Sequence, residues 1–342
     1  MFKIAREALP ALFAKMAEIA DLFLPVKNNI NTEYARFTPE SAVDLETLKT
    51  AKSPKDLFFP QSETLYTCHR DGKKLSVVPE KLAEAPFIVF GMRACDIQGV
   101  AVLDRVFLSE PQDSFYAARR QNGLLIGMAC TEPEESCFCG TFGIDHTAPG
   151  GDVDTMLTKT HLYWMPCTEK GQVLTEKLAD LLQEAKEDEL DKEKEKAKAL
   201  MEAMPYKDVS VEGWGAAAAD KNFDSPLWES LAKPCLACGT CTFVCPTCQC
   251  YDIKDYETGH GVKRYRCWDS CMYSDFTMMA HGNNRTTQMQ RFRQRFMHKL
   301  AYFPANNDGM FSCVGCGRCV EKCPSALNIV KVIKAFGGEQ HA

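Results

Sequence analysis

Two stretches of the sequence decide the fold of its second half: PCLACGTCTFVCP at 234–246 and SCVGCGRCVEKCP at 312–324. Both have the spacing Cys-x2-Cys-x2-Cys-x3-Cys-Pro, the ligand run of two-cluster ferredoxins. Three thiolates of one run hold one [4Fe–4S] cube, and the fourth cysteine crosses to the other cube. The spacing therefore predicts two cubes, one held by Cys235, Cys238, Cys241 and Cys323, the other by Cys313, Cys316, Cys319 and Cys245.

A single run of this kind is also compatible with zinc, but two matched runs that both end in Cys-Pro favour iron–sulfur clusters. Gly239 and Gly317 ease the tight turns between ligands. The insert between Cys245 and Cys313 is long and shows a mostly helical pattern. We therefore expect an α-helical dicluster module rather than a compact bacterial ferredoxin.

The composition narrows the class of protein. The chain has 342 residues, 18 cysteines and a formal net charge of −6. A chain of this length builds a core without disulfides, and it shows neither a signal-peptide pattern nor an apolar run long enough for a membrane span. We expect a cytoplasmic protein whose cysteines bind metal. The acidic balance and the lack of a phosphate-binding glycine motif disfavour nucleic-acid and nucleotide partners.

The first half of the chain has an α/β pattern. An amphipathic helix is expected at 10–24, a β-hairpin around Asp71-Gly72 and a helix at 96–108. Apolar runs predict buried strands at 85–91, 123–130 and 161–167. Strands that alternate with helices indicate a mixed α/β domain, which we place at 1–172.

The rest of the chain divides into two parts. Residues 173–225 are expected to form a charged, solvated helix and a linker. Residues 226–342 are expected to be the α-helical ferredoxin-like dicluster domain, with helices at 285–303 and 326–336.

A second group of cysteines lies in the α/β domain. Cys95 and Cys130 each follow a predicted buried strand, and parallel neighbouring strands would bring both to one sheet edge. Cys137 and Cys139 follow in a polar, glycine-containing loop. The four thiols are candidates for a third cluster; the alternative is that they are buried core thiols.

A third group consists of Cys248, Cys250, Cys267 and Cys271. These thiols are either a fourth metal site or buried groups that tune the two cubes through hydrogen bonds. Cys68 and Cys167 are isolated and expected to be structural.

One basic stretch stands out in the acidic chain, made up of Arg285, Arg291, Arg293, Arg295 and Lys299. It is either a solvated helix face or a docking surface for an acidic partner.

These motifs resemble a known family. GMRACDIQGVAVLDRVFL (91–108), ESCFCGTFG (135–143), CTFVCPTCQCYDI (241–253), RCWDSCMY (266–273) and CVGCGRCVEKCP (313–324) are similar to the iron–sulfur component of anaerobic sulfite reductase. They are equally similar to the beta subunit of cytoplasmic [NiFe] sulfhydrogenases, and to related subunits of complexes that join an NAD(P)H-oxidising flavin subunit to a heterodisulfide-reductase-type module. The resemblance covers 60–145 and 226–330.

The resemblance implies an electron-transfer subunit rather than a catalyst. A flavin subunit with its own [2Fe–2S] centre would take hydride from NAD(P)H. This chain would pass the electrons singly to a terminal hydrogenase, sulfite reductase or heterodisulfide-reductase-type subunit. The family pattern has cysteines at the positions of the candidate third cluster, which strengthens that prediction. It also has Cys248, Cys250 and Cys271 but none at Cys267, which argues against a fourth cluster on all four.

Two other functions are compatible with parts of the sequence. The extra cysteines of the third group would form an open cluster if the chain were itself catalytic and reduced a disulfide or sulfur substrate. A cluster-based redox sensor is disfavoured because no DNA-binding motif is present.

Overall fold

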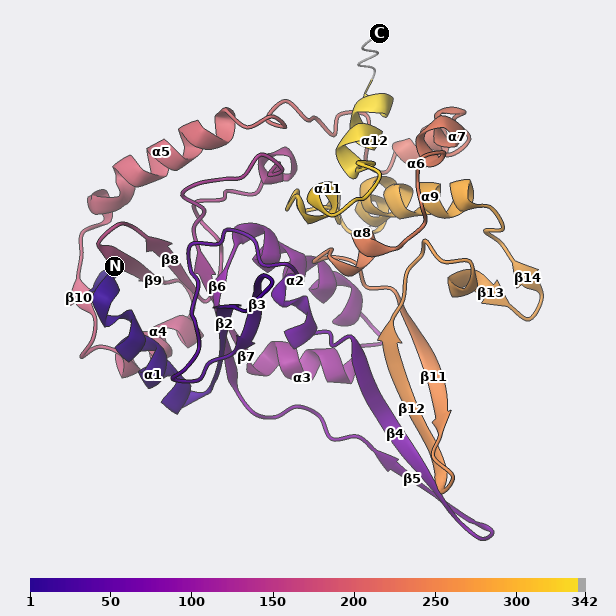
Figure 1. Ribbon diagram of the computed structural model, residues 1–342, viewed down its shortest axis with the longest axis horizontal. Helices are drawn as coiled ribbons and strands as arrows, with labels where there is room; N and C mark the ends of the chain where they lie inside the picture. Colours follow the sequence, from indigo (N-terminus) through magenta and orange to yellow (C-terminus); the bar gives the residue numbers. More distant parts are fainter. Residues whose placement is uncertain (338–342) are drawn as a thin grey trace.

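The computed structural model describes residues 1–337 (Figure 1). An eight-stranded mixed sheet forms the N-terminal part. In spatial order its strands are β10 (Gln183–Glu184), β1 (Phe2–Ala5), β9 (His161–Pro166), β8 (Val153–Leu157), β7 (Gly123–Met128), β6 (Phe87–Met92), β2 (Asp21–Lys27) and β3 (Thr32–Arg36). The four strands β8, β7, β6 and β2 run parallel, and the outer strands are antiparallel. The predicted mixed α/β fold is confirmed.

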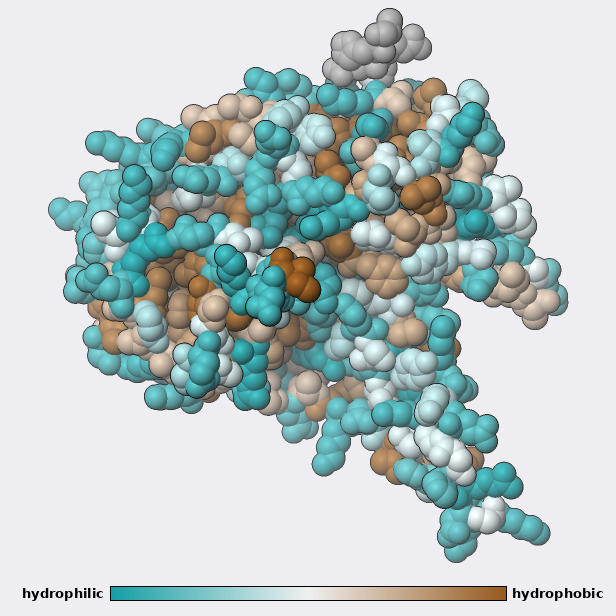
Figure 2. Space-filling view, viewed as in Figure 1, coloured by the Kyte–Doolittle hydropathy of each residue, from teal (hydrophilic) through white to brown (hydrophobic). Residues whose placement is uncertain are grey.

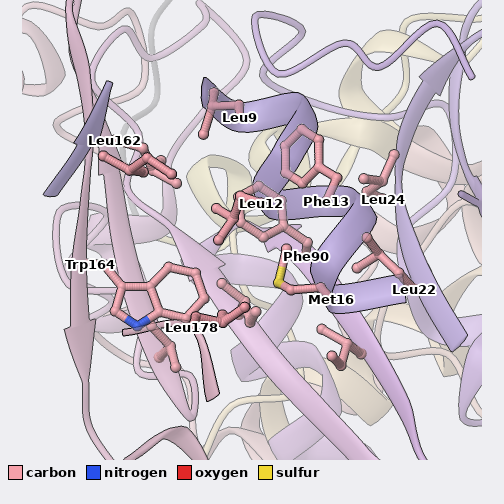
Figure 3. Close-up of a cluster of buried hydrophobic side chains, with 14 of the residues drawn as sticks. Leu9, Leu12, Phe13, Met16, Leu22, Leu24, Phe90, Leu162, Trp164 and Leu178 are labelled. Atoms are coloured by element: carbon pink, nitrogen blue, oxygen red, sulfur yellow. The ribbon is translucent and has the colours of Figure 1, made fainter. Parts of the chain in front are cut away.

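Helices cover both faces of this sheet. On one face α1 (Leu9–Ile19) and α4 (Glu169–Lys177) pack on a core that includes Leu12, Phe90 and Trp164 (Figure 3). On the other, α2 (Ala94–Phe107) and α3 (Ser114–Asn122) bury Leu103 and Tyr116 against the sheet. Burial on both faces explains why β6 is apolar without alternation.

The amphipathic helix is shorter than the prediction of 10–24. It ends at Ile19, and β2 begins at Asp21. The apolar period changes at this point: Leu22 and Leu24 lie two residues apart and are both buried, which is the spacing of a strand rather than of a helix. The charged helix expected within 173–225 is likewise not continuous: α4 ends at Lys177, and α5 (Asp191–Glu202) is a separate helix. Figure 2 shows mostly hydrophilic side chains where α5 lies, as expected for a solvated helix.

A second, four-stranded antiparallel sheet projects from the body (Figure 1). Its order is β11 (Tyr251–Glu257), β12 (Gly261–Trp268), β4 (Ser62–Asp71) and β5 (Lys74–Pro79). The hairpin β4–β5 was predicted. The hairpin β11–β12 was not, and the expectation of a mostly helical insert after Cys245 is wrong at this point. Aromatic and β-branched residues around a Thr-Gly-His-Gly turn were the missed signal.

The remaining C-terminal elements are mostly helical. They are α6 (Ala218–Phe223), α7 (Leu227–Ala232), α8 (Thr240–Phe243), the short strands β13 (Met278–Met279) and β14 (Gly282–Asn283), α9 (Gln288–Met297), the π-helix η6 (His298–Tyr302), α10 (Phe303–Asn306), α11 (Arg318–Glu321) and α12 (Ile329–Phe336). Helices lie within the predicted ranges 285–303 and 326–336, but they begin later, at Gln288 and at Ile329. Trp228, Phe292 and Ile333 lie in their shared core. No helix within 1–337 is long and apolar enough to cross a membrane.

Arg266 on β12 ties the projecting sheet to the α/β part. Its side chain is 3% exposed, and its Nε donates to Glu63 Oε2 at 2.6 Å. Its guanidinium also pairs with Asp113, just before α3, and lies 5.2 Å from the Phe59 ring. A buried charge network of this kind is costly to break, because removal of one partner leaves the others uncompensated.

We therefore predict that Arg266→Met lowers the free energy of unfolding by about 3–5 kcal/mol. Arg264→Met is the matched control, because Arg264 lies two residues away on β12 and pairs with Asp255 at the surface. Water screens that pair, so its loss is expected to have little effect. Thermal unfolding of anaerobically prepared protein measures both changes; equal losses in the two variants would contradict the anchoring role of Arg266.

Candidate iron–sulfur centres

The first predicted ligand set surrounds one cavity. Cys235, Cys238, Cys241 and Cys323 all line it, together with α9 side chains that include Arg295 and Phe296. Cys238 is exposed, whereas its three partners are half-buried. Gly239 has a φ of +72°, and a Cβ there would lie 2.6 Å from the Tyr273 hydroxyl oxygen. Glycine is therefore required both by the turn and by the close approach of Tyr273.

The second set also gathers in one place. Cys245 is close enough to raise the pKa of Cys313, Cys316 and Cys319. Burial, reinforced by Cys245 and Cys319, raises the pKa of the Cys316 thiol to about 12. Cys245 therefore lies near the three cysteines of the other run, and the assignment of these four to one cube stays a prediction.

Cys245 has an environment that favours the thiolate. The Cys248 thiol donates to it, Lys299 lies nearby, and the Thr247 hydroxyl is 3.2 Å from its sulfur. These contacts hold the pKa of Cys245 well below its usual range despite burial. Metal ligation requires a deprotonated cysteine, so this position is prepared for it.

The four cysteines of the α/β part converge at one sheet edge. Strands β6 and β7 are parallel neighbours, so Cys95 and Cys130, which follow them, come together as predicted. Cys139 lies near Cys130 and Cys137, and burial raises its pKa to about 12. All four thiols are buried. Cys137 and Cys139 are thus buried although their loop is polar, as expected for thiols that bind a metal centre.

The third group does not assemble as a whole. Cys248 hydrogen-bonds to Cys245, and Cys250 hydrogen-bonds to Cys271. Cys267 lies on β12 instead, where Asp252, Lys254 and Asp269 are its charged neighbours. Cys68 pairs with Val262 and Val77 within the projecting sheet, and Cys167 is exposed. Within 1–337, no three His, Cys, Asp or Glu side chains converge as the ligands of a single metal ion.

The second ligand set and the cysteines of the α/β part are neighbours. Cys95 and Cys316 share a buried cluster with Val102 and Val314. The Phe138 amide donates to the Gly315 carbonyl at 3.0 Å, which joins the two cysteine loops directly. The first and second sets also adjoin, because Cys319 is among the groups that raise the pKa of Cys241. The three sets therefore form a continuous series.

Comparison with known proteins agrees with this architecture. Residues 234–327 match the 4Fe-4S dicluster domain family. The chain is 32% identical over 335 residues to sulfhydrogenase 2 subunit beta of Pyrococcus furiosus, which covers 97% of this chain and 96% of that relative. The chain belongs to the sulfhydrogenase beta subunit family. The predicted family resemblance is confirmed, and no solved structure matches the chain.

Buried cations accompany the cysteines of this family member, and sequence patterns alone did not reveal them. Arg295 and Lys299 are 3% and 4% exposed, so the expectation that they belong to a solvated or docking face is wrong. Lys299 Nζ donates to Thr247 Oγ1 at 2.7 Å, and Lys55 Nζ donates to the Cys248 carbonyl at 2.9 Å. Arg93 lies against Cys130. Buried positive charge fits sites that carry net negative charge when cubes are bound.

We predict about 12 irons per chain in anaerobically purified protein, as expected for three cubes. Cys130→Ser should remove about 4 of them, because serine replaces one ligand of the set in the α/β part. Cys68→Ser should leave the iron content unchanged and serves as the control. Iron and acid-labile sulfide analysis measures both. About 8 irons in the unaltered protein would show that this set consists of buried thiols, and about 16 would require a fourth cluster.

Proposed function

We propose that this chain is an electron-transfer subunit of a cytoplasmic, multi-subunit oxidoreductase of the hydrogenase type. The observation that carries the proposal is the uninterrupted series of three cysteine sets. Cys319 is close enough to raise the pKa of Cys241, which places the first two sets side by side, and Cys95 and Cys316 share one buried cluster, which places the second beside the third. Closely spaced redox sites within one chain are what a relay of single electrons needs.

The ligand assignment is part of the proposal. The first cube is held by Cys235, Cys238, Cys241 and Cys323, and the second by Cys313, Cys316, Cys319 and Cys245. The third is held by Cys95, Cys130, Cys137 and Cys139. The cavity around the first set, the position of Cys245 beside the second run and the convergence at the β6–β7 edge support these assignments.

The protein holds and insulates these sites. When bound, [4Fe–4S] clusters take up and release one electron at a time. Phe292 and Phe296 pack beside the first set, and Val314 lies within the second, which limits water at the sulfur atoms. Lys299 and Arg295 supply positive charge next to the thiolates. Burial alone disfavours added negative charge, and fixed cations offset this because their attraction is stronger in a low dielectric than in water.

The series has two ends, one for a donor and one for an acceptor. Cys238 is the exposed cysteine of the first set. At the other end Lys49 lies beside Cys137 and pairs with Glu134 and Glu321, which are partly exposed. We propose that one end receives electrons from a flavin and [2Fe–2S] subunit that oxidises NAD(P)H. The other end passes them to a terminal module, for which the name of the relative favours a hydrogenase over a sulfite reductase or a heterodisulfide-reductase-type subunit.

A catalytic role in disulfide or sulfur reduction is the alternative. The proximity of Cys250 and Cys271 favours it, because their hydrogen bond lowers the pKa of Cys250 to about 7, in the range of reactive dithiols. The separate position of Cys267 weighs against an open cluster on all four cysteines. Turnover of such a substrate by the isolated chain with an artificial reductant would favour this alternative.

We predict that Cys235→Ser or Cys313→Ser interrupts electron transfer in the assembled complex. Reduction of the flavin by NAD(P)H should continue, because that step precedes the relay. Cys167→Ser, at an exposed and isolated thiol, is the control. Stopped-flow flavin absorbance and turnover with the natural acceptor separate the two steps. Full turnover in both ligand variants would rule out the relay.

A further inference from the structure

Arg295 occupies the junction between the first and second cysteine sets. It projects from α9 into the lining of the cavity of the first set, and its Nη2 donates to the Cys241 carbonyl at 3.4 Å. It is also close to Cys319 of the second set, where burial raises the thiol pKa and the positive charge of Arg295 opposes that rise. Of the neighbouring thiols, Cys241 and Cys319 raise the pKa of Arg295 most. One guanidinium is therefore close to both sites.

The hydrogen-bonding capacity of Arg295 is not used up by the protein. Its Nε is buried and has no acceptor within the described residues. An unsatisfied N–H on a buried cation is costly, and buried polar groups in proteins are normally paired. Thiolate or inorganic sulfur of a bound cube is the acceptor that this position would meet.

The other deeply buried arginines of the C-terminal half have a different arrangement. Arg318 is paired with Asp96 through two hydrogen bonds of 2.6 and 2.9 Å, and Arg266 is paired with Glu63 and Asp113. Their charges are neutralised by carboxylates, as in structural ion pairs. The neighbouring groups that raise the pKa of Arg295 are all cysteines. Its counter-charge must therefore come from the two sulfur sites.

We propose that Arg295 is a positioning residue shared by both cubane sites, whose N–H groups and positive charge raise the reduction potentials of the two sites together. One-electron reduction adds a negative charge to a site, and a fixed cation within the protein stabilises that reduced form. Because the one cation acts on both sites, it shifts both potentials in the same direction. This inference rests on the ligand assignment proposed above.

The test is a redox titration of anaerobic holoprotein, with dithionite as reductant and the EPR signals of the two cubes as readout. In Arg295→Gln, which keeps donors but removes the charge, both midpoint potentials should fall by about 59 mV or more, a tenfold change in the ratio of reduced to oxidised sites. Arg295→Lys keeps the charge and should restore most of the loss. Arg293→Gln is the matched control on the same helix, because Arg293 turns away and lies 3.6 Å over the Phe223 ring.

Each outcome decides the inference. Unchanged potentials in Arg295→Gln at full iron content, or a shift of only one site, would overturn it. If Arg295→Gln loses iron, restoration of iron by Arg295→Lys supports the charge-based role, and failure of that rescue contradicts it. Absence of two cubane signals from the unaltered protein would instead refute the proposed ligand assignment.

Discussion

The structure depends on a single electrostatic constraint: sulfur ligands that are to carry negative charge lie in places with little water. Burial alone would keep the thiols protonated, as the raised pKa of Cys139 shows. The chain counters this with cations that are themselves buried, Lys299 beside Cys245 and Arg93 beside Cys130. Neither partner is stable in that setting without the other. Much of the polar interior is organised around this balance of charge.

The same constraint explains why the two halves of the chain are interlocked. The loops of the second set and of the cysteines after β6 and β7 meet through the Phe138–Gly315 hydrogen bond. The buried pair Arg318–Asp96 crosses the same boundary, next to Cys316 and Cys95. Such contacts fix the spacing of neighbouring sites more firmly than a flexible linker would. Transfer between sites would depend on that spacing, so the interface between the halves belongs to the proposed relay.

Local patterns predicted local structure well. The double ferredoxin spacing indicated that Cys323 lies beside the first run and Cys245 beside the second, while the ligand crossover itself stays a prediction. The apolar runs before Cys95 and Cys130 indicated their shared sheet edge. Long-range pairing was beyond such patterns. The sequence around Cys267 does not indicate that β12 pairs with β4. This pairing places Cys267 in the projecting sheet, away from the other thiols of its group. Arg295 and Lys299 were misjudged for a similar reason, because charge in a sequence suggests exposure until its counter-charge is located.

The pairing of β12 with β4 also affects how the protein is made. During synthesis on the ribosome, β4 and β5 emerge long before β12. Until β12 is made, the edge of β4 that pairs with it stays unpaired and is exposed to pairing with other chains. Asp113 meanwhile lacks Arg266, whereas Glu63 has a second partner, Arg119, in the N-terminal half. The N-terminal half therefore reaches its final form only after most of the chain has left the ribosome.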